Sequence, residues 1–522
     1  MHRRRLVRAL STSTVVVSAL LAGCAPLLAA NPRYATDSGA RPQGQPAPEP
    51  KADGPPAVES PKNDLSWRNC TSQIFSESAV DPLPGVILDC ASYDADLDPI
   101  AGATGSVSIG VVRARSVQTP ENAGPLVMTT GSDLPTSVQL PVWLSRAGAD
   151  VLKSNPIVAI DRRGMGMSSP IDCRDMFDRQ EMLEQAQFQS GDDPVANLSA
   201  ITQTATTNCT DTIAPGDSAY DNAHAAEDIE RLRDLWDVPA LALLGIGNGA
   251  QVALAYAGSH PDKVARLVLD SPLPVGIGAE AATEQRVKGE QAALDAFAAQ
   301  CAASDCPLGP DPKAAVDALL ADARAGNGPG GASVATVADA ITTALAYPRG
   351  DRTAATNSLA SALAAARSGD VNQLNNLINQ ADTLRQTDGQ FVNTCSDALN
   401  RPTPDRVREL VVAWPKVYPQ FGAVGALSMV QCLNWPSGSA PKEPQDLKIP
   451  VLLMGVQNDP IVGNEGVSQV AATIINAGTS SKRVIWQGIG HGASIYSECA
   501  LAPMIGYLDS GNVPETDTYC PA

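Results

Sequence analysis

An aspartate and a histidine near the C-terminus have the types and spacing of a proton-transfer pair. Asp459 follows the apolar run "VLLMGV", and His491 lies in the glycine-lined segment "GIGHGAS" further along the chain. A carboxylate after one strand can orient the imidazole of a histidine after the next, which then acts as a base toward a hydroxyl or water. We therefore predict that Asp459 and His491 form a catalytic pair. Taken singly, Asp459 also fits a turn residue before Pro460, and His491 an ordinary loop histidine.

The segment "LLGIGNGAQ" has the glycine spacing of the G-x-S-x-G turn that presents a catalytic serine, but its central residue is Gly247. Gly245 and Gly249 keep the small residues that let a strand and a helix approach each other. Asn248 is not a usable nucleophile, and it is predicted as an oxyanion residue together with Gly131. The simpler interpretation is a glycine-rich strand end.

Other candidate groups are weaker. Ser132 and Ser137 in "TTGSDLPTS" and Ser271 after "RLVLD" could supply a relocated hydroxyl, although serines in loops and at strand ends mostly form turns. His224 and His260 are predicted to be surface or cap residues. With no C-x-x-C motif and only four scattered histidines, the sequence predicts no metal and no cofactor.

Strand patterns alternate with helical patterns on both sides of a long helical stretch. The fold class is therefore predicted as α/β, a mostly parallel sheet covered by helices, with chemistry at the carboxyl ends of the strands. Residues 277–444 are Ala-rich and helical and are predicted to be an inserted lid. The sheet domain then comprises residues 65–276 and 445–522.

The N-terminus has the features of an exported lipoprotein. Residues 1–23 resemble a signal peptide that ends in a lipobox, which predicts lipid attachment at Cys24 and a membrane anchor on the outer face. Arg3–Arg5 fits either a twin-arginine signal or a plain basic start. Residues 24–64 are rich in Pro and Ala and are predicted to be a disordered tether. The protein is therefore predicted to be exported and either anchored by lipid to the outer face of the cell membrane, held in the cell envelope, or secreted.

The cysteines support export. Of 11 cysteines, removing Cys24 leaves an even number, as expected where disulfides form. Spacing alone cannot fix the pairing, but the positions suggest neighbouring couples. These are Cys70 with Cys90, Cys173 with Cys209, Cys301 with Cys306, Cys395 with Cys432, and Cys499 with Cys520.

Composition excludes one function class. The chain is 44% hydrophobic with a formal net charge of −19, so it is globular and acidic. Nucleic-acid binding is therefore not expected.

Several segments, in order, resemble the tripeptidyl-aminopeptidase-like family of secreted actinobacterial α/β hydrolases, which is related to proline iminopeptidases. They are "IVAIDRRGMGMSSPIDC", "HPDKVARLVLDSPLP", "CLNWP" and "SECALAPMIGYLDSGNVPETDTYC". The resemblance implies an α/β-hydrolase fold with a helical lid and an ancestral release of short peptides from a free amino terminus. The chain departs from the family at Gly247, where the family has serine, and at residues 129–137, where the family has a Gly-Gly-Pro-Gly loop.

Three hypotheses for function remain. The first is a protein without catalysis whose cleft binds a peptide, an acyl ligand or a protein partner. The second is an active hydrolase in which His491, supported by Asp459, activates water directly. The third is a purely structural envelope protein, which a sealed lid over an apolar interior would favour.

Overall fold

The computed structural model describes residues 55–146, 148–185 and 193–522. The predicted signal peptide, Cys24 and residues 24–54 of the predicted tether lie outside these ranges. None of the helices in the described ranges combines the length and the apolar composition that crossing a membrane requires.

A ten-stranded sheet forms the centre of the structure, in the order β1-β2-β3-β5-β4-β6-β7-β8-β9-β10. β1, β2 and β3 pair antiparallel, β3 pairs antiparallel with β5, and the remaining pairs are parallel. This confirms the predicted α/β class. The strands are β1 (Arg68–Asn69), β2 (Val86–Asp96), β3 (Ser106–Ser116), β4 (Leu126–Thr129), β5 (Ile157–Ile160), β6 (Leu241–Ile246), β7 (Val264–Asp270), β8 (Val451–Asn458), β9 (Ser481–Ile489) and β10 (Thr518–Cys520).

Helices cover both faces of the sheet. The central strands are buried apolar runs, as expected for a sheet covered on both sides. One apolar cluster joins the sheet to α5 (Asn222–Trp236), α6 (Asn248–Ser259) and α15 (Glu465–Asn476). A second cluster joins the opposite face to α1 (Thr71–Glu77), α2 (Thr136–Leu144), η1 (Gly148–Lys153), α16 (Ala493–Tyr496) and α17 (Glu498–Ser510).

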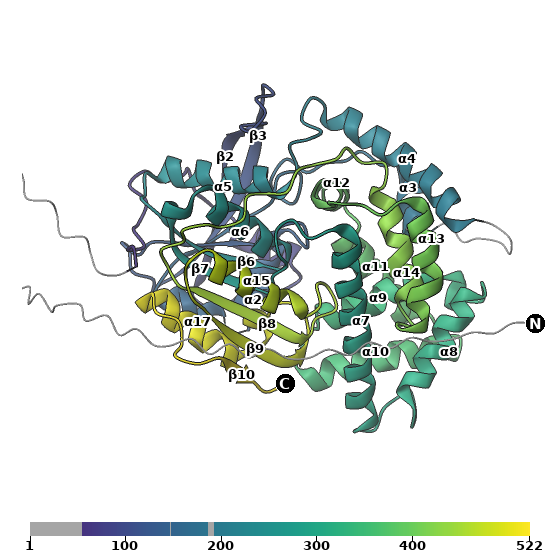
Figure 1. Ribbon diagram of the computed structural model, residues 1–522. Coiled ribbons are helices and arrows are strands. Elements are labelled where there is room, and N and C mark those ends of the chain that lie inside the picture. The colour runs from purple at the N-terminus through teal and green to yellow at the C-terminus, as the bar shows by residue number, and fades with distance from the viewer. Residues whose placement is uncertain (1–54, 147, 186–192) are drawn as a thin grey trace, which may run out of the picture. The chain divides into compact units, whose positions relative to one another are not determined.

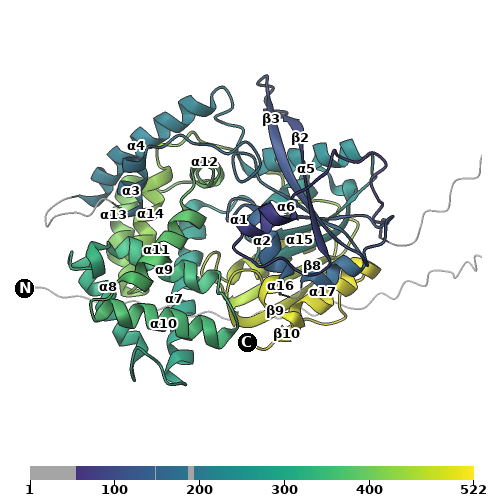
Figure 2. The ribbon, with the colours of Figure 1, turned by 180° about the vertical axis from the view of Figure 1, so that it is seen from behind.

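A separate group of helices, here called the helical body, lies beside the sheet (Figures 1 and 2). Its own apolar cluster includes Phe297, Leu363, Trp414 and Val430. Its α-helices are α7 (Ala279–Ala302), α8 (Pro312–Arg324), α9 (Val334–Ala346), α10 (Arg352–Arg367), α11 (Asn372–Arg385), α12 (Asp388–Asp397), α13 (Pro404–Ala413) and α14 (Gly422–Ser428). It also contains the short 3-10 helices η3 (Pro329–Gly331), η4 (Trp414–Lys416) and η5 (Met429–Cys432). The short helix η2 (Pro261–Lys263) belongs to the sheet domain.

The helical body contains more of the chain than the predicted lid. α3 (Met176–Leu183) and α4 (Pro194–Ile213) precede it in sequence, yet α4 packs on η5 and α13. Val195 and Leu198 of α4 belong to the same apolar cluster as the lid helices. The prediction that residues 65–276 all belong to the sheet domain is therefore wrong for α3 and α4.

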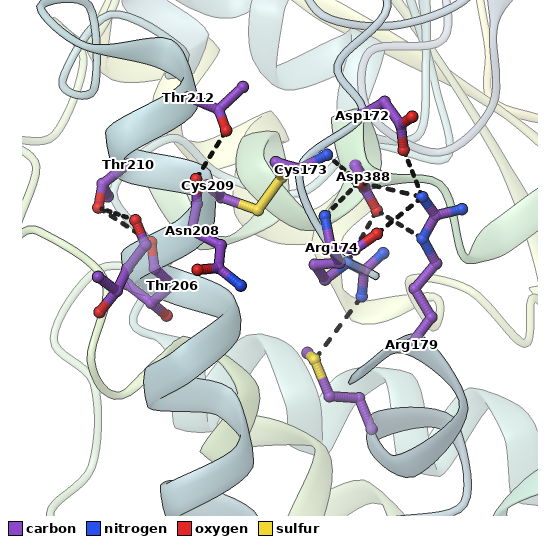
Figure 3. Close-up of a disulfide and its surroundings, with 12 residues drawn as sticks. Asp172, Cys173, Arg174, Arg179, Thr206, Asn208, Cys209, Thr210, Thr212 and Asp388 are labelled. Atoms are coloured by element: carbon purple, nitrogen blue, oxygen red, sulfur yellow. Dashed lines mark hydrogen bonds and ion pairs between the residues drawn. A yellow bond between two sulfur atoms is a disulfide. The ribbon is translucent and has the colours of Figure 1, made fainter. Parts of the chain in front are cut away.

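Five disulfides close the neighbouring cysteine couples and confirm the proposed pairing. The bond between Cys173 and Cys209 ties the segment after β5 to α4, as Figure 3 shows. Next to it, the buried guanidinium of Arg174 donates from Nε to Asp388 of α12 at 2.8 Å. This junction fixes α4 and α12 against the chain that leaves the sheet.

The folded part starts earlier than the predicted boundary at residue 65. The backbone N–H of Lys62 donates to the carbonyl of Trp236 at 2.9 Å, and the carbonyl of Pro56 accepts from Arg266. Residues 55–64 therefore lie on the sheet domain, and the prediction of a disordered tether is wrong for them.

Candidate active site

A sharp turn joins β6 to α6 at Gly247. Its φ of 58° and ψ of −120° are accessible to glycine at little cost and strained for other residues. The N–H of Gly247 donates to the carbonyl of Asp270 at the end of β7. The third glycine of the motif, Gly249, packs against the carbonyl of Thr129 so closely that a Cβ would overlap it. The turn therefore has the strand-to-helix geometry that the glycine spacing predicts.

His491 and Asp459 lie together behind this turn. Nδ1 of His491 is 3.0 Å from Oδ2 and 3.1 Å from Oδ1 of Asp459. Asp459, which directly follows β8, is fully buried and also accepts from the N–H groups of Ile461 and Val462. The backbone N–H of His491 donates to Ala346 of α9. The structure thus brings the two predicted residues into direct contact.

A third acidic residue, Asp133, completes this group and was not predicted from the sequence. Its Oδ2 accepts from the backbone N–H of Asn248 at 2.7 Å and lies 3.3 Å from Nε2 of His491. Its side chain is 15% exposed. It lies within "TTGSDLPTS", the segment in which the sequence analysis had considered Gly131, Ser132 and Ser137 but not the aspartate. The imidazole of His491 therefore lies between the carboxylates of Asp133 and Asp459.

The carboxylate of Asp133 fills the space that a side chain at Gly247 would need. A Cβ on Gly247 would lie well under 3.0 Å from Oδ2 of Asp133 and from Nε2 of His491, closer than real Cβ atoms approach other groups. A hydroxyl on residue 247 and the carboxylate of Asp133 therefore exclude each other in this arrangement.

Charge on both sides holds a proton on His491. Burial alone lowers the pKa of the imidazole, but the charge of Asp459 and the hydrogen bonds that the ring donates to both carboxylates outweigh burial and raise this pKa to about 10. At neutral pH His491 is therefore an imidazolium that donates from both ring nitrogens. In that state the ring is a proton donor and not a base.

Neither predicted oxyanion donor is free among the described residues. The N–H of Asn248 is bound to Asp133, and the N–H of Gly131 donates to the hydroxyl of Thr129 at 3.2 Å. The neighbouring N–H, of Ser132, donates to Oδ1 of Asn248 at 2.9 Å. These N–H groups could form an oxyanion hole only if they gave up their present acceptors.

The hydroxyls of the serine candidates have hydrogen-bond partners or positions other than the imidazole of His491. The hydroxyl of Ser137 donates to Asp161 at 2.7 Å, and the hydroxyl of Ser271 accepts from the N–H of Gly492. Ser132 lines the cleft described below, but among the described residues none of the three hydroxyls is hydrogen-bonded to His491. The structure therefore brings no serine onto the imidazole.

One histidine prediction needs correction. His224 is buried, and its ring nitrogens lie 2.7 Å from Asp221 and 3.1 Å from Asp98. It is an N-terminal residue of α5 held between two carboxylates, not a surface residue. His260, at the end of α6, is partly exposed and contacts Glu227.

A buried arginine fixes Asn248 and links it to the helical body. Nη1 of Arg162 donates to Oδ1 of Asn248 and to Asp397 of α12, each at 2.7 Å. The guanidinium also binds Asn222 and the carbonyl of Tyr220. Because a buried ion pair with several hydrogen bonds is rigid, the N-terminus of α6 is held in one position.

A cleft of about 370 Å³ lies between this group and the helical body. Asp133 and Asn248 line it, together with residues of α7, α9, α11 and α12. The lining is mixed, with apolar side chains such as Phe391 and Ile461 beside arginines such as Arg385. In the described ranges, no three His, Cys, Asp or Glu side chains form a metal-binding group.

Comparisons with known proteins find similarity to one family model and to several hydrolases. The family model described as TAP-like protein matches residues 418–520. Serine protease Hip1 of Mycobacterium tuberculosis and of Mycobacterium bovis is 24% identical over 252 residues, which is 48% of this chain and 47% of Hip1. The chain thus matches the curated relatives over about half of their length.

Solved structures of hydrolases also match over most of the chain. Esterase E22 covers 81% of this chain and 99% of its own, at 12% identity and a TM-score of 0.39. A serine hydrolase from Cycloclasticus zankles covers 81% and 98%, at 11% identity and a TM-score of 0.37. The similarity to TAP-like proteins thus lies in residues 418–520, which contain β8, β9 and β10 of the mostly parallel sheet.

Proposed function

We propose that this protein has lost the serine reaction of its family and that its cleft serves to bind a ligand. The observation that carries the proposal is that the turn after β6 lacks a side chain and that a carboxylate from another loop lies beside the histidine. Gly247 offers no hydroxyl, and the carboxylate of Asp133 occupies the space next to His491. In this proposal the family's serine has been replaced by glycine.

The expected loss of rate is large. Removing the nucleophile of a serine hydrolase lowers kcat by about a millionfold, and removing one oxyanion donor lowers it by about a hundred- to a thousandfold. Here both parts are affected, because the N–H of Asn248 is bound to Asp133. Amide and ester hydrolysis by the serine mechanism should therefore be undetectable.

The second hypothesis, direct activation of water by His491, receives less support. A general base must be unprotonated and must face its water, whereas Nε2 of His491 faces Asp133 and its pKa is raised to about 10. Asp133 would have to leave before water could take its place. A sealed structural protein is also less favoured, because the side chain of Asp133 is partly open to the cleft.

For the ligand we retain the classes expected from the sequence: a peptide, an acyl ligand or a protein partner in the cleft. The mixed lining, with Phe391 and Ile461 beside Arg385, supports a ligand with apolar and acidic parts. We also propose export with a lipid anchor at Cys24. The five disulfides support export, since such bonds persist in oxidising compartments.

A substrate panel tests the loss of serine chemistry. Purified wild-type protein and His491→Ala are incubated with tripeptidyl amides, aminoacyl amides and short-chain esters. We expect the same background rate for both proteins. Turnover by the wild type that disappears in His491→Ala would instead show an active hydrolase and refute the proposal.

A further inference from the structure

The carboxylates that line the cleft differ in how fully their oxygens are paired. Among the described residues, the aspartates of the lining are Asp133, Asp339 and Asp397. Both oxygens of Asp339 and both oxygens of Asp397 accept hydrogen bonds from the protein. Oδ2 of Asp133 accepts from Asn248 and lies 3.3 Å from Nε2 of His491, but Oδ1 has no partner within the described ranges. One carboxylate oxygen in the cleft therefore remains available to a cationic donor.

The arginines of the lining differ in the same way. Those in the described part of the chain are Arg174, Arg286, Arg385 and Arg401. Nη2 of Arg174, of Arg286 and of Arg401 donates to acceptors in the protein. Nη1 of Arg385 donates to Asp339 at 2.6 Å, whereas its Nε and Nη2 have no acceptor among the described residues. These two nitrogens form the edge of a guanidinium that binds a carboxylate through two parallel hydrogen bonds.

The segments that carry the unpaired oxygen and the unpaired edge are neighbours. Nε2 of Gln390 donates to the carbonyl of Asp133 at 2.7 Å and to the carbonyl of Leu384, the residue before Arg385, at 2.9 Å. Tyr347 lies within electrostatic reach of both charges. Burial and the charge of Asp133 raise the pKa of its phenol, while the charge of Arg385 opposes this shift. A small ligand can therefore contact both charged groups at once.

A small apolar cluster adjoins both groups. It consists of Leu134, Ala346 and Tyr347, with Leu384 and Ile461 packed against them. Leu134 directly follows Asp133 in the chain, and Leu384 directly precedes Arg385. Tyr347 and Ile461 also line the cleft. An apolar part of a ligand would be removed from water against these side chains.

We propose that the cleft binds a free amino acid with an apolar side chain. The ammonium group donates to Oδ1 of Asp133, the carboxylate accepts from Nε and Nη2 of Arg385, and the side chain packs on Tyr347 and Ile461. A simple acid would leave the charge of Asp133 without a partner, and a simple amine would leave the edge of Arg385 empty.

A single amino acid suits the site better than a peptide does. Its ammonium and carboxylate are attached to one carbon, and the two contact points belong to segments that Gln390 joins through one nitrogen. In a serine hydrolase the place beside the imidazole holds the nucleophilic hydroxyl and the carbonyl that it attacks. Here that place would hold a cation.

This inference rests on the proposed function in that the cleft admits a ligand, and it goes beyond it by naming both charges of that ligand. Its test measures binding and not turnover. Absence of amino-acid binding would leave the loss of serine chemistry standing. Turnover on the substrate panel, in contrast, would not remove amino-acid binding. The two proposals can therefore fail separately.

Isothermal titration calorimetry of the wild-type protein tests the two charges with three probes of similar shape. L-Leucine carries both charges, isopentylamine lacks the carboxylate, and isocaproate lacks the ammonium. We expect saturable binding of L-leucine and at least about tenfold weaker binding of each analogue, because each analogue loses hydrogen bonds between charged groups. No saturable binding of L-leucine, equal binding of either analogue, or tighter binding of dileucine than of L-leucine would overturn the proposal.

Two variants assign each charge to its partner. Asp133→Asn should bind L-leucine at least about tenfold more weakly and should no longer prefer it to isocaproate. Arg385→Lys keeps a cation for Asp339 but removes the guanidinium edge, so it should lose most of its preference for L-leucine over isopentylamine. A variant that weakens all three probes by the same factor would show a merely structural effect and contradict the assignment.

Matched substitutions outside the cleft serve as controls. Asp150→Asn changes an exposed carboxylate that pairs with Lys153, and Arg406→Lys changes an exposed guanidinium that pairs with Glu280. Both variants should bind L-leucine as the wild type does. A loss of affinity in either control as large as that in Asp133→Asn would contradict the proposed contacts.

Discussion

At the scale of single residues, the positions of Gly247 and Asp133 depend on each other, because a Cβ at residue 247 would overlap Oδ2 of Asp133. The missing side chain at residue 247 leaves room for a carboxylate that comes from a different loop. That carboxylate binds the same backbone N–H, of Asn248, and the same imidazole that a serine hydrolase uses in catalysis. In this structure Nε2 of His491 therefore faces a carboxylate and not a hydroxyl.

The protonation of His491 gives a direct prediction. Because the folded pKa of about 10 lies above the unfolded value of about 6.5, the stabilisation from this group is fully present below about pH 6.5 and is lost as the pH rises through about 10. Asp133→Asn removes one of the two carboxylates that contact His491 and should therefore lower the pKa of His491. The stabilisation from this group should then be lost at a lower pH than in the wild type. The measurement is an NMR titration of the ring, assigned with His491→Gln. An unchanged pKa in Asp133→Asn would contradict the assignment.

At this scale the sequence predicted part of the site. Asp459 and His491 were predictable because each follows an apolar strand pattern in the order that the chemistry requires. Asp133 was not, because no spacing rule relates a residue after β4 to a turn after β6. Only the three-dimensional proximity of the two strands, which are direct neighbours in the sheet, brings Asp133 to Gly247.

At the scale of helices and strands, the site lies at the carboxyl ends of parallel strands, as the fold class predicts. β4 leads into the loop of Asp133, β6 into Gly247, β8 into Asp459 and β9 into the loop of His491. The helical body is attached to this edge through α12, whose Asp388 and Asp397 bind Arg174 and Arg162.

The buried pair of Arg174 and Asp388 should stabilise this attachment strongly. Asp388→Ala leaves a guanidinium buried without its partner and should lower the free energy of unfolding by about 3–5 kcal/mol. Asp172→Ala, which removes an exposed partner of Arg179, is the matched control and should cost less than about 1 kcal/mol. Urea denaturation measures both. Equal losses would show that the pair does not hold α12.

Most elements were predictable from periodicity, and the exceptions have physical reasons. The apolar runs of β4–β9 and the amphipathic pattern of α5 are local signals. The membership of α3 and α4 in the helical body is not local, because it depends on packing against η5 and α13, which are far away in sequence.

At the scale of the whole molecule, the described chain is a ten-stranded α/β sheet with an adjoining helical body, cross-linked by disulfides. Its five disulfides each join nearby cysteines, which is why their pairing could be proposed from the sequence. Two of them, Cys173–Cys209 and Cys395–Cys432, lie together in one apolar cluster of the helical body. The framework around the cleft is therefore strongly constrained, although the serine reaction is proposed to be lost.

Labelling by a fluorophosphonate probe, which reacts with an activated serine, tests most directly whether a hydroxyl at residue 247 and the carboxylate of Asp133 exclude each other. Wild type, Gly247→Ser, Asp133→Gly and the double variant are compared at neutral pH. The double variant should be labelled at residue 247. The other three proteins should stay unlabelled, because they lack the introduced hydroxyl or keep the carboxylate of Asp133 in its place. Equal labelling of Gly247→Ser and the double variant, labelling of the wild type, or no labelling of the double variant would contradict this mutual exclusion.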